Sequence, residues 1–168
     1  MSRIRRFAFI VKAVAAVALL APSFLCAQGE RGAIVVEITG FRNSHGKAGV
    51  LLFSREKGFP ADHRQALESR FAEIVGNACR VTLEDIPYGN YAVSVFHDEN
   101  GDGALQLSMF GIPREGVGAS RNPAMRFGPP RFRDARFTLD SHEHRLAISM
   151  RYPGKRPEPD TGDGGAGK

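Results

Sequence analysis

Between residues 34 and 152, apolar and polar side chains alternate far more often than they recur at helical spacing. Ile34, Val36 and Ile38, for example, share one face of an extended segment, because successive side chains of a strand point to opposite sides. About seven such segments follow one another closely, so we predict an all-β fold, an antiparallel β-sandwich of about seven strands. The predicted strands are 34–39, 48–53, 71–75, 79–84, 91–97, 132–139 and 145–152.

Residues that favour turns predict how these segments are connected. Asn, Ser, His and Gly at 43–46 join the first two strands, which we expect to pair as a hairpin. Residues 59–69 form the one stretch that permits a short helix. Residues 105–130 are rich in glycine and proline and have little period of their own, which predicts one long loop.

The N-terminal segment differs from the rest of the chain. Three arginines precede an uninterrupted apolar run at 13–21, and small residues follow, which is typical of a signal peptide cleaved after Ala27. The run is too short to span a membrane, and Lys12 interrupts its extension, so we expect no transmembrane anchor in the mature protein. Cleavage as a lipoprotein before Cys26 is an alternative that the bulky residues ahead of this cysteine disfavour.

Removal of the signal peptide changes both the net charge and the number of cysteines of the mature protein. Four of the 23 basic residues and none of the 18 acidic ones lie in residues 1–27, which leaves a formal charge of +1 on the remainder. A nearly neutral, exported domain at 28–152 argues against nucleic-acid binding and predicts a periplasmic or secreted protein. Its single cysteine, Cys79, excludes an internal disulfide, and we expect it to be buried. Residues 153–168 have a composition typical of a disordered tail.

An acidic loop follows the predicted strand 91–97. Asp98, Asn100 and Asp102 stand at alternate positions before Gly103, as in the first half of a calcium-binding loop. Position twelve of that register is Met109, where a bidentate glutamate is needed, so the loop would hold calcium only weakly. The alternative is an ordinary polar β-turn, which requires the same residue types.

Three histidines are candidates for chemistry. His97 falls on the same face as the apolar residues of its strand, so we interpret it as a core residue hydrogen-bonded to backbone. A metal ligand, a general base and a ligand contact are the alternatives for its imidazole. His142 and His144 lie in a polar turn and are expected to face solvent.

Positive charge is concentrated between residues 114 and 136, a segment that contains six arginines and only two acidic residues. Arginine suits carboxylates, phosphates and anionic sugars, so this segment is a candidate for ligand or partner binding. The alternative is that these arginines pair with the acidic turns at 84–85 and 98–99, or face solvent. The candidate binding residues are Arg114, Arg121, Arg126, Phe127 and His97.

No catalytic residue is assigned, because no nucleophile motif, phosphate-binding glycine loop or zinc-protease motif occurs in the sequence. The predicted function is that of an exported, non-catalytic module that binds a ligand or envelope partner through its arginine-rich loop. One alternative is a structural domain stabilised by calcium at Asp98, Asn100 and Asp102. Another is an unrecognised hydrolase that uses His97 with one of these aspartates.

A series of short motifs also occurs in order along the chain. They are Gly-Phe-Arg-Asn-Ser-His-Gly at 40–46, Leu-Leu-Phe-Ser at 51–54, Gly-Phe-Pro at 58–60, Ile-Pro-Tyr-Gly-Asn-Tyr-Ala-Val at 86–93, His-Asp-Glu-Asn-Gly-Asp-Gly at 97–103, Phe-Gly-Ile-Pro at 110–113 and Phe-Gly-Pro-Pro at 127–130. In these motifs, from about residue 34 to 152, the chain resembles the exported bacterial family catalogued as domain of unknown function 2141.

The resemblance implies a transthyretin-like or carboxypeptidase-regulatory-like β-sandwich, in which the Pro-x-Gly-x-Tyr turn at 87–91 enters a central strand. It implies no settled activity. The chain departs from the family's pattern after the acidic loop, where the family usually continues with Lys-Leu-Asp and this sequence has Ala104, Leu105 and Gln106. This departure weakens the case for a metal.

Overall fold

The computed structural model describes residues 29–109, 113–125 and 128–152. The predicted signal peptide and the predicted tail lie outside the described residues, as do the candidate binding residues Arg126 and Phe127. In the described part of the chain, no helix is long and apolar enough to cross a membrane.

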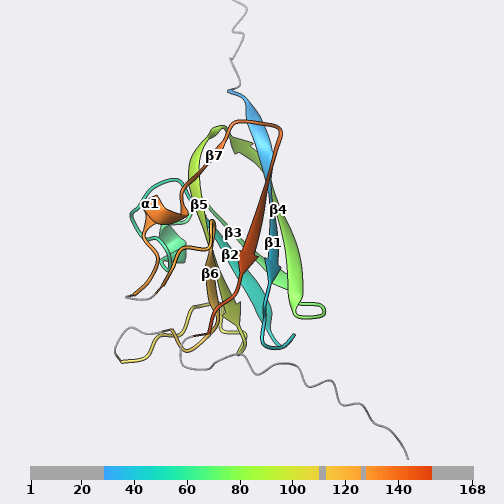
Figure 1. Ribbon diagram of the computed structural model, residues 1–168, viewed down its shortest axis with the longest axis vertical. Helices are drawn as coiled ribbons and strands as arrows, with labels where there is room; N and C mark the ends of the chain where they lie inside the picture. The colour runs from blue at the N-terminus through green and yellow to red at the C-terminus, as the bar shows by residue number, and fades with distance from the viewer. Residues whose placement is uncertain (1–28, 110–112, 126–127, 153–168) are drawn as a thin grey trace, which may run out of the picture.

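Two β-sheets pack face to face, and a layer of loops and short helices covers the outer face of one of them (Figure 1). The three-stranded sheet has the order β4-β1-β8, and the other has the order β3-β2-β5-β6, with β7 also paired to β5. The predicted all-β sandwich is confirmed, with eight strands in the described residues. The strands are β1 (Arg31–Thr39), β2 (Lys47–Phe53), β3 (Glu68–Glu73), β4 (Ala78–Pro87), β5 (Gly89–Asp98), β6 (Val117–Ala119), β7 (Phe137–Leu139) and β8 (Glu143–Ser149).

The main core lies between the two sheets and contains the residues that the alternation predicts. Ile34, Val36 and Ile38 of β1 are completely buried, and Val50 and Leu52 of β2 face them from the other sheet. Fully burying an aliphatic side chain of this size contributes about 1.5–3 kcal/mol to folding. The period-two pattern therefore locates the core correctly.

The predicted hairpin between the first two strands is wrong. β1 pairs with β4 and β8, whereas β2 pairs with β3 and β5, so the two strands belong to different sheets. The connecting segment carries Phe41, whose side chain is buried in the main core. This segment therefore crosses from one sheet to the other over the end of the core.

One strand pair departs from the antiparallel arrangement. β8 pairs with β1 in the parallel direction, from Ala33 beside Glu143 to Thr39 beside Ser149. β8 follows β7 of the five-stranded sheet after residues 140–142, where the chain crosses to the other sheet and takes the place beside β1. The sandwich is thus mixed, with its remaining strand pairs in the described residues antiparallel.

The outer layer contains the segment 59–69, for which the sequence allows a short helix, and the start of the predicted strand 132–139. The stretch 59–69 contains a short 3-10 helix at His63–Gln65 and the first residues of β3. The predicted strand 132–139 begins as the helix α1 (Phe132–Ala135) before β7. Phe59 and Phe132 pack edge to face, and Phe59 also contacts Phe53 of β2. The reason for the helix is therefore tertiary, because Phe132 covers apolar side chains on the outer face of β2 and β5.

The turn between β4 and β5 is formed as predicted. β4 ends at Pro87 and β5 begins at Gly89, with Tyr91 as the third residue of the new strand. The Tyr91 hydroxyl donates a hydrogen bond of 2.7 Å to the Pro87 carbonyl, which ties the start of β5 to the end of β4. β5 is then buried from Tyr91 to Asp98, because strands flank it on both sides and both of its faces are covered.

Cys79 on β4 is half-buried and has no disulfide partner. Burial raises the pKa of its thiol from 9.0 to about 11. Because the thiolate is the reactive form, we expect iodoacetamide to modify Cys79 about 100-fold more slowly at pH 8 in the folded protein than in urea. Mass spectrometry of the Cys79 peptide measures this rate, and equal rates in the two states would contradict a buried thiol.

Candidate functional site

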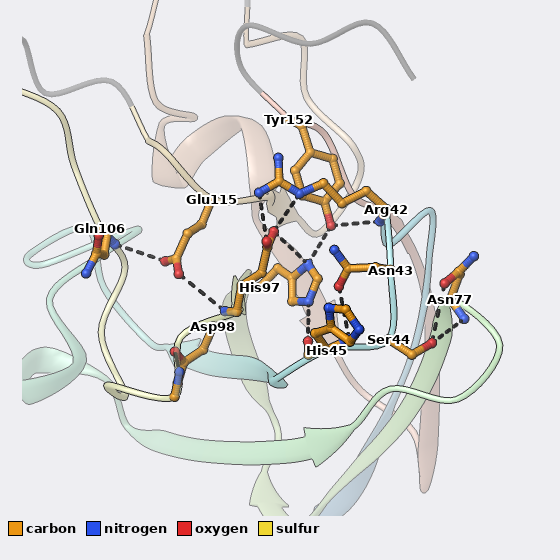
Figure 2. Close-up of polar contacts among 12 residues, drawn as sticks. Arg42, Asn43, Ser44, His45, Asn77, His97, Asp98, Gln106, Glu115 and Tyr152 are labelled. Carbon is orange, nitrogen blue, oxygen red and sulfur yellow. Dashed lines mark hydrogen bonds and ion pairs between the residues drawn. The ribbon is translucent and has the colours of Figure 1, made fainter. Parts of the chain in front are cut away.

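His97 lies near the end of β5, and its imidazole is completely buried. The Nε2 atom donates a hydrogen bond of 2.7 Å to the carbonyl oxygen of His45, which requires a proton on Nε2 (Figure 2). In the neutral ring, Nδ1 is then an acceptor, and the hydroxyl of Tyr152 lies 2.7 Å from it. Both ring nitrogens therefore have partners, as expected of a core histidine.

Tyr152 and Arg42 extend this network. The tyrosine oxygen accepts a hydrogen bond of 3.0 Å from the backbone N–H of Arg42, and burial raises the pKa of the tyrosine hydroxyl. The Arg42 guanidinium lies 4.9 Å from the centre of the Tyr152 ring. The hydroxyl therefore remains protonated at neutral pH and donates toward His97.

Glu99 joins the same cluster through its carboxylate. Arg42 Nη2 donates to Glu99 Oε2 over 2.8 Å, and Arg42 Nε lies 2.7 Å from Oε1. The hydrogen bond to Glu99 raises the pKa of the Arg42 guanidinium. Glu99 Oε1 is also 3.4 Å from Nδ1 of His97. His97, Tyr152, Arg42 and Glu99, which we call the polar cluster, thus come from three distant segments and bind mainly one another (Figure 2).

The acidic turn after β5 binds its own backbone. Asp98 is buried, and its Oδ1 atom accepts hydrogen bonds from the N–H groups of Gly101 and Asp102 at 2.8 and 3.1 Å. Its Oδ2 atom accepts a third from the N–H of Gly103 at 2.9 Å. These contacts make the segment a closed polar turn.

Asp102 is the second aspartate of the turn, and it is exposed. It accepts hydrogen bonds from the side-chain amides of Gln106 and Asn100, which lower its pKa together with the backbone N–H of Ala104. Within the described ranges, no three His, Cys, Asp or Glu side chains are grouped to hold a metal ion. Calcium binding at Asp98, Asn100 and Asp102 stays a prediction.

Glu115 connects the acidic turn to the arginine-rich segment. Its buried carboxylate accepts hydrogen bonds from the N–H groups of Glu99 and Gln106, at 3.3 and 3.0 Å (Figure 2). Burial raises its pKa, and the nearby charges of Asp98 and Asp102 act in the same direction. The start of the arginine-rich segment is therefore attached to the end of β5.

The arginines of this segment do not gather at one place. Arg114 lies beside the acidic turn, where its N–H donates to the carbonyl of Gln106. Arg121 lies beyond the far end of β6, past the point where Ala119 pairs with Ser94. There its Nη1 atom donates a hydrogen bond of 3.2 Å to the carbonyl of Arg136. The structure thus separates Arg114 from Arg121 and brings Arg121 to Arg136.

Among the described residues, the acidic turns form no ion pair with these arginines. The carboxylate of Asp85 pairs with Arg31, and that of Glu99 pairs with Arg42, both outside the segment 114–136. Across the parts of the chain that the structure describes, neither Arg121 nor Arg136 has a carboxylate within ion-pair distance. Their guanidinium groups therefore remain available to an anion.

Arg121 and Arg136 line a shallow depression of about 460 Å³ between the β8 edge of one sheet and β7 on the other. His144 of β8 stacks on Phe137 of β7, with ring centres 4.9 Å apart and an angle of 16° between the planes. None of the described residues that line this depression is acidic. They are Asn90, Arg121, Arg136, Phe137, Thr138, His144 and Leu146.

A family model described as an uncharacterized protein conserved in bacteria (DUF2141) matches residues 36–147 of this chain. The chain belongs to this family. No curated protein and no solved structure matches it. The relation of this DUF2141 domain to transthyretin-like sandwiches therefore stays a prediction.

The DUF2141 match contains both the acidic turn and the arginine depression, whereas Tyr152 lies beyond it. Sequence reasoning included Arg136 in the basic segment but did not select it, and it expected His144 to face solvent. His144 is instead half-buried against Phe137. The alternation that places Leu146 inward, extended by two residues, would have found His144.

Proposed function

We propose that this DUF2141 protein is an exported, non-catalytic module that binds an anionic ligand or envelope partner through its segment 114–136. The observation that carries this proposal is the pair Arg121 and Arg136, which meet at a depression without an acidic residue around it. Unpaired guanidinium groups on a fixed scaffold are suited to carboxylate and phosphate oxygens. The acids that would have neutralised them are paired with Arg31 and Arg42.

Export follows from the basic and apolar pattern of residues 1–27, and it places the site in the periplasm or outside the cell. The state of the candidate acid and base groups supports the non-catalytic role. The imidazole of His97 has both nitrogens occupied, and the Asp98 carboxylate accepts three backbone hydrogen bonds. Neither group faces a space that a substrate could enter, because both side chains are buried.

The test compares two triple variants of the purified protein for salt-sensitive binding to immobilised sulfated dextran, with neutral dextran as the blank. In the first variant, Arg114, Arg121 and Arg126 become serine, and we expect the melting midpoint to stay and the binding to fall at least about tenfold. The matched control changes Arg64, Arg70 and Arg80 to serine, which removes the same charge from arginines that already have carboxylate partners.

Binding that falls equally in both variants would overturn the proposal, because net charge alone would then explain it. Loss of folding in the first variant would also overturn it, because those arginines would then be structural. Binding that falls only in the first variant supports the segment 114–136 as the binding surface.

Calcium stabilisation is the second candidate function, and the acidic turn allows a direct test. The Asp98 oxygens already accept hydrogen bonds from three backbone N–H groups, which hold the turn closed. We therefore expect the same thermal midpoint in 5 mM calcium, on the order of the weakest extracellular sites, and in chelator. A midpoint that rises by several degrees in calcium, and does not rise in Asp98→Asn, would establish a calcium site at this turn instead.

A further inference from the structure

The turn that carries Arg121 has an unusual backbone. Arg121 and Asn122 both have positive φ angles, 64° and 48°, a conformation that residues with a Cβ atom rarely adopt. Asn122 is held there by its side chain, which accepts a hydrogen bond from the N–H of Ser149 and donates one to the carbonyl of Ala147. The side chain thus pairs with the free edge of β8 as a short strand would. Such strain persists where the surroundings impose it, often at binding sites.

This turn directs Arg121 toward two further donors. The hydrogen bond from Arg121 Nη1 to the Arg136 carbonyl holds the Arg121 side chain against the backbone of Arg136, and both residues line the depression. At the start of β5, Asn90 Oδ1 accepts a hydrogen bond of 3.0 Å from the hydroxyl of Thr138. The oxygen of this amide is therefore occupied, and its NH₂ group is the end left to donate. The donors come from three separate segments around one depression.

The rest of the depression is lined by Phe137, Thr138, His144 and Leu146. Phe137 and Leu146 are each 8 % exposed, and the imidazole of His144 lies flat on the Phe137 ring. A planar or aliphatic group can pack against this surface while an anionic group meets the arginines. A ligand with both an anionic oxygen group and a carbon skeleton fits these two parts.

We propose that this depression is a binding site for an organic phosphate, with the phosphate at Arg121, Arg136 and Asn90 and the carbon skeleton over His144. This inference rests on the proposed function and narrows its ligand. A carboxylate is satisfied by one guanidinium in its own plane, whereas a phosphate has three oxygens that point in different directions. Three donor groups from three segments match the phosphate better.

The purified protein is titrated separately with glycerol 3-phosphate, inorganic phosphate and acetate. Nuclear magnetic resonance of the backbone amides measures binding in each titration. We expect shifts confined to 89–91, 120–122, 136–138 and 144–146, with tighter binding of glycerol 3-phosphate than of inorganic phosphate or acetate. Arg121→Gly and Arg136→Gln should each weaken this binding at least about tenfold. Glycine accepts the positive φ at 121, so the first variant removes the guanidinium without straining the turn.

Arg64→Gln is the matched control, because Arg64 is also exposed but pairs with Asp62, outside the depression and outside the segment 114–136. Its binding should equal that of the unchanged protein. Vesicles of phosphatidylglycerol, compared with phosphatidylcholine, identify the source of the phosphate. Binding to the former that glycerol 3-phosphate displaces supports a lipid headgroup, whereas binding of the soluble ester alone supports a soluble phosphate.

Two results would overturn the inference. One is the absence of any shift with glycerol 3-phosphate, and the other is a shift that Arg121→Gly and Arg136→Gln leave unchanged. If the dextran binding still depends on the segment 114–136 in that case, the proposed function stands and only this ligand class fails. If the dextran binding does not depend on the segment either, both proposals fail.

Discussion

Replacing His97 with alanine is expected to lower the free energy of unfolding by about 4 kcal/mol. The substitution opens a cavity at a completely buried position. It also leaves the His45 carbonyl and the Tyr152 hydroxyl without the partners that lie 2.7 Å away. A buried polar group without a hydrogen bond costs about 1–3 kcal/mol. The loss of these two hydrogen bonds therefore lowers the stability about as much as the cavity does. Urea denaturation followed by circular dichroism measures the loss.

Tyr152→Phe is the matched control for this prediction. It keeps the aromatic ring and removes only the oxygen that contacts Nδ1 of His97 and the N–H of Arg42. We expect a loss of about 1–2 kcal/mol, because no large cavity forms. If His97→Ala were as stable as the unchanged protein but bound sulfated dextran less well, the buried network would be wrong and His97 would be a ligand contact.

The core could be predicted from the sequence because alternation is a local property of each strand. Ile34, Val36 and Ile38 share a face whatever strand lies beside them, and all three are buried. The partner of a strand is not local in this sense. The turn residues at 43–46 favour a hairpin, yet Phe41 in the same connection is buried in the core and carries the chain to the other sheet.

The candidate site shows the same division. The alternation along β5 is enough to predict that His97 lies on the buried face of the strand. Its hydrogen-bond partners could not be predicted, because His45 and Tyr152 are 52 and 55 residues away in the sequence. Arg121 could be selected from the charge pattern. Its neighbour Arg136 depends on how β6 and β7 both pair with β5, at opposite halves of that strand.

Gly46→Ala has the second large expected effect, a loss of more than about 4 kcal/mol or failure to fold. Gly46 has a φ of +67°, and a Cβ atom added to it would overlap the carbonyl oxygen of Asp98 and lie 2.8 Å from the Cα atom of Glu99. Both contacting atoms belong to the backbone at the end of β5, so neither can move away by a side-chain rotation. Relief would require the strand end to move, and with it the His45 carbonyl that holds His97.

Gly101→Ala distinguishes the two causes of this loss of stability, which are the positive φ angle and the steric contact with β5. Gly101 has a similar φ of +75°, but nothing lies within 4 Å of the Cβ atom that alanine would add. Alanine there should cost only about 1–2 kcal/mol, the penalty of the left-handed conformation itself. The difference between the two variants in urea denaturation therefore measures the steric contact of Gly46 with β5. Equal losses would mean that the connection 40–46 can move away from the strand, and that the polar cluster does not depend on its position.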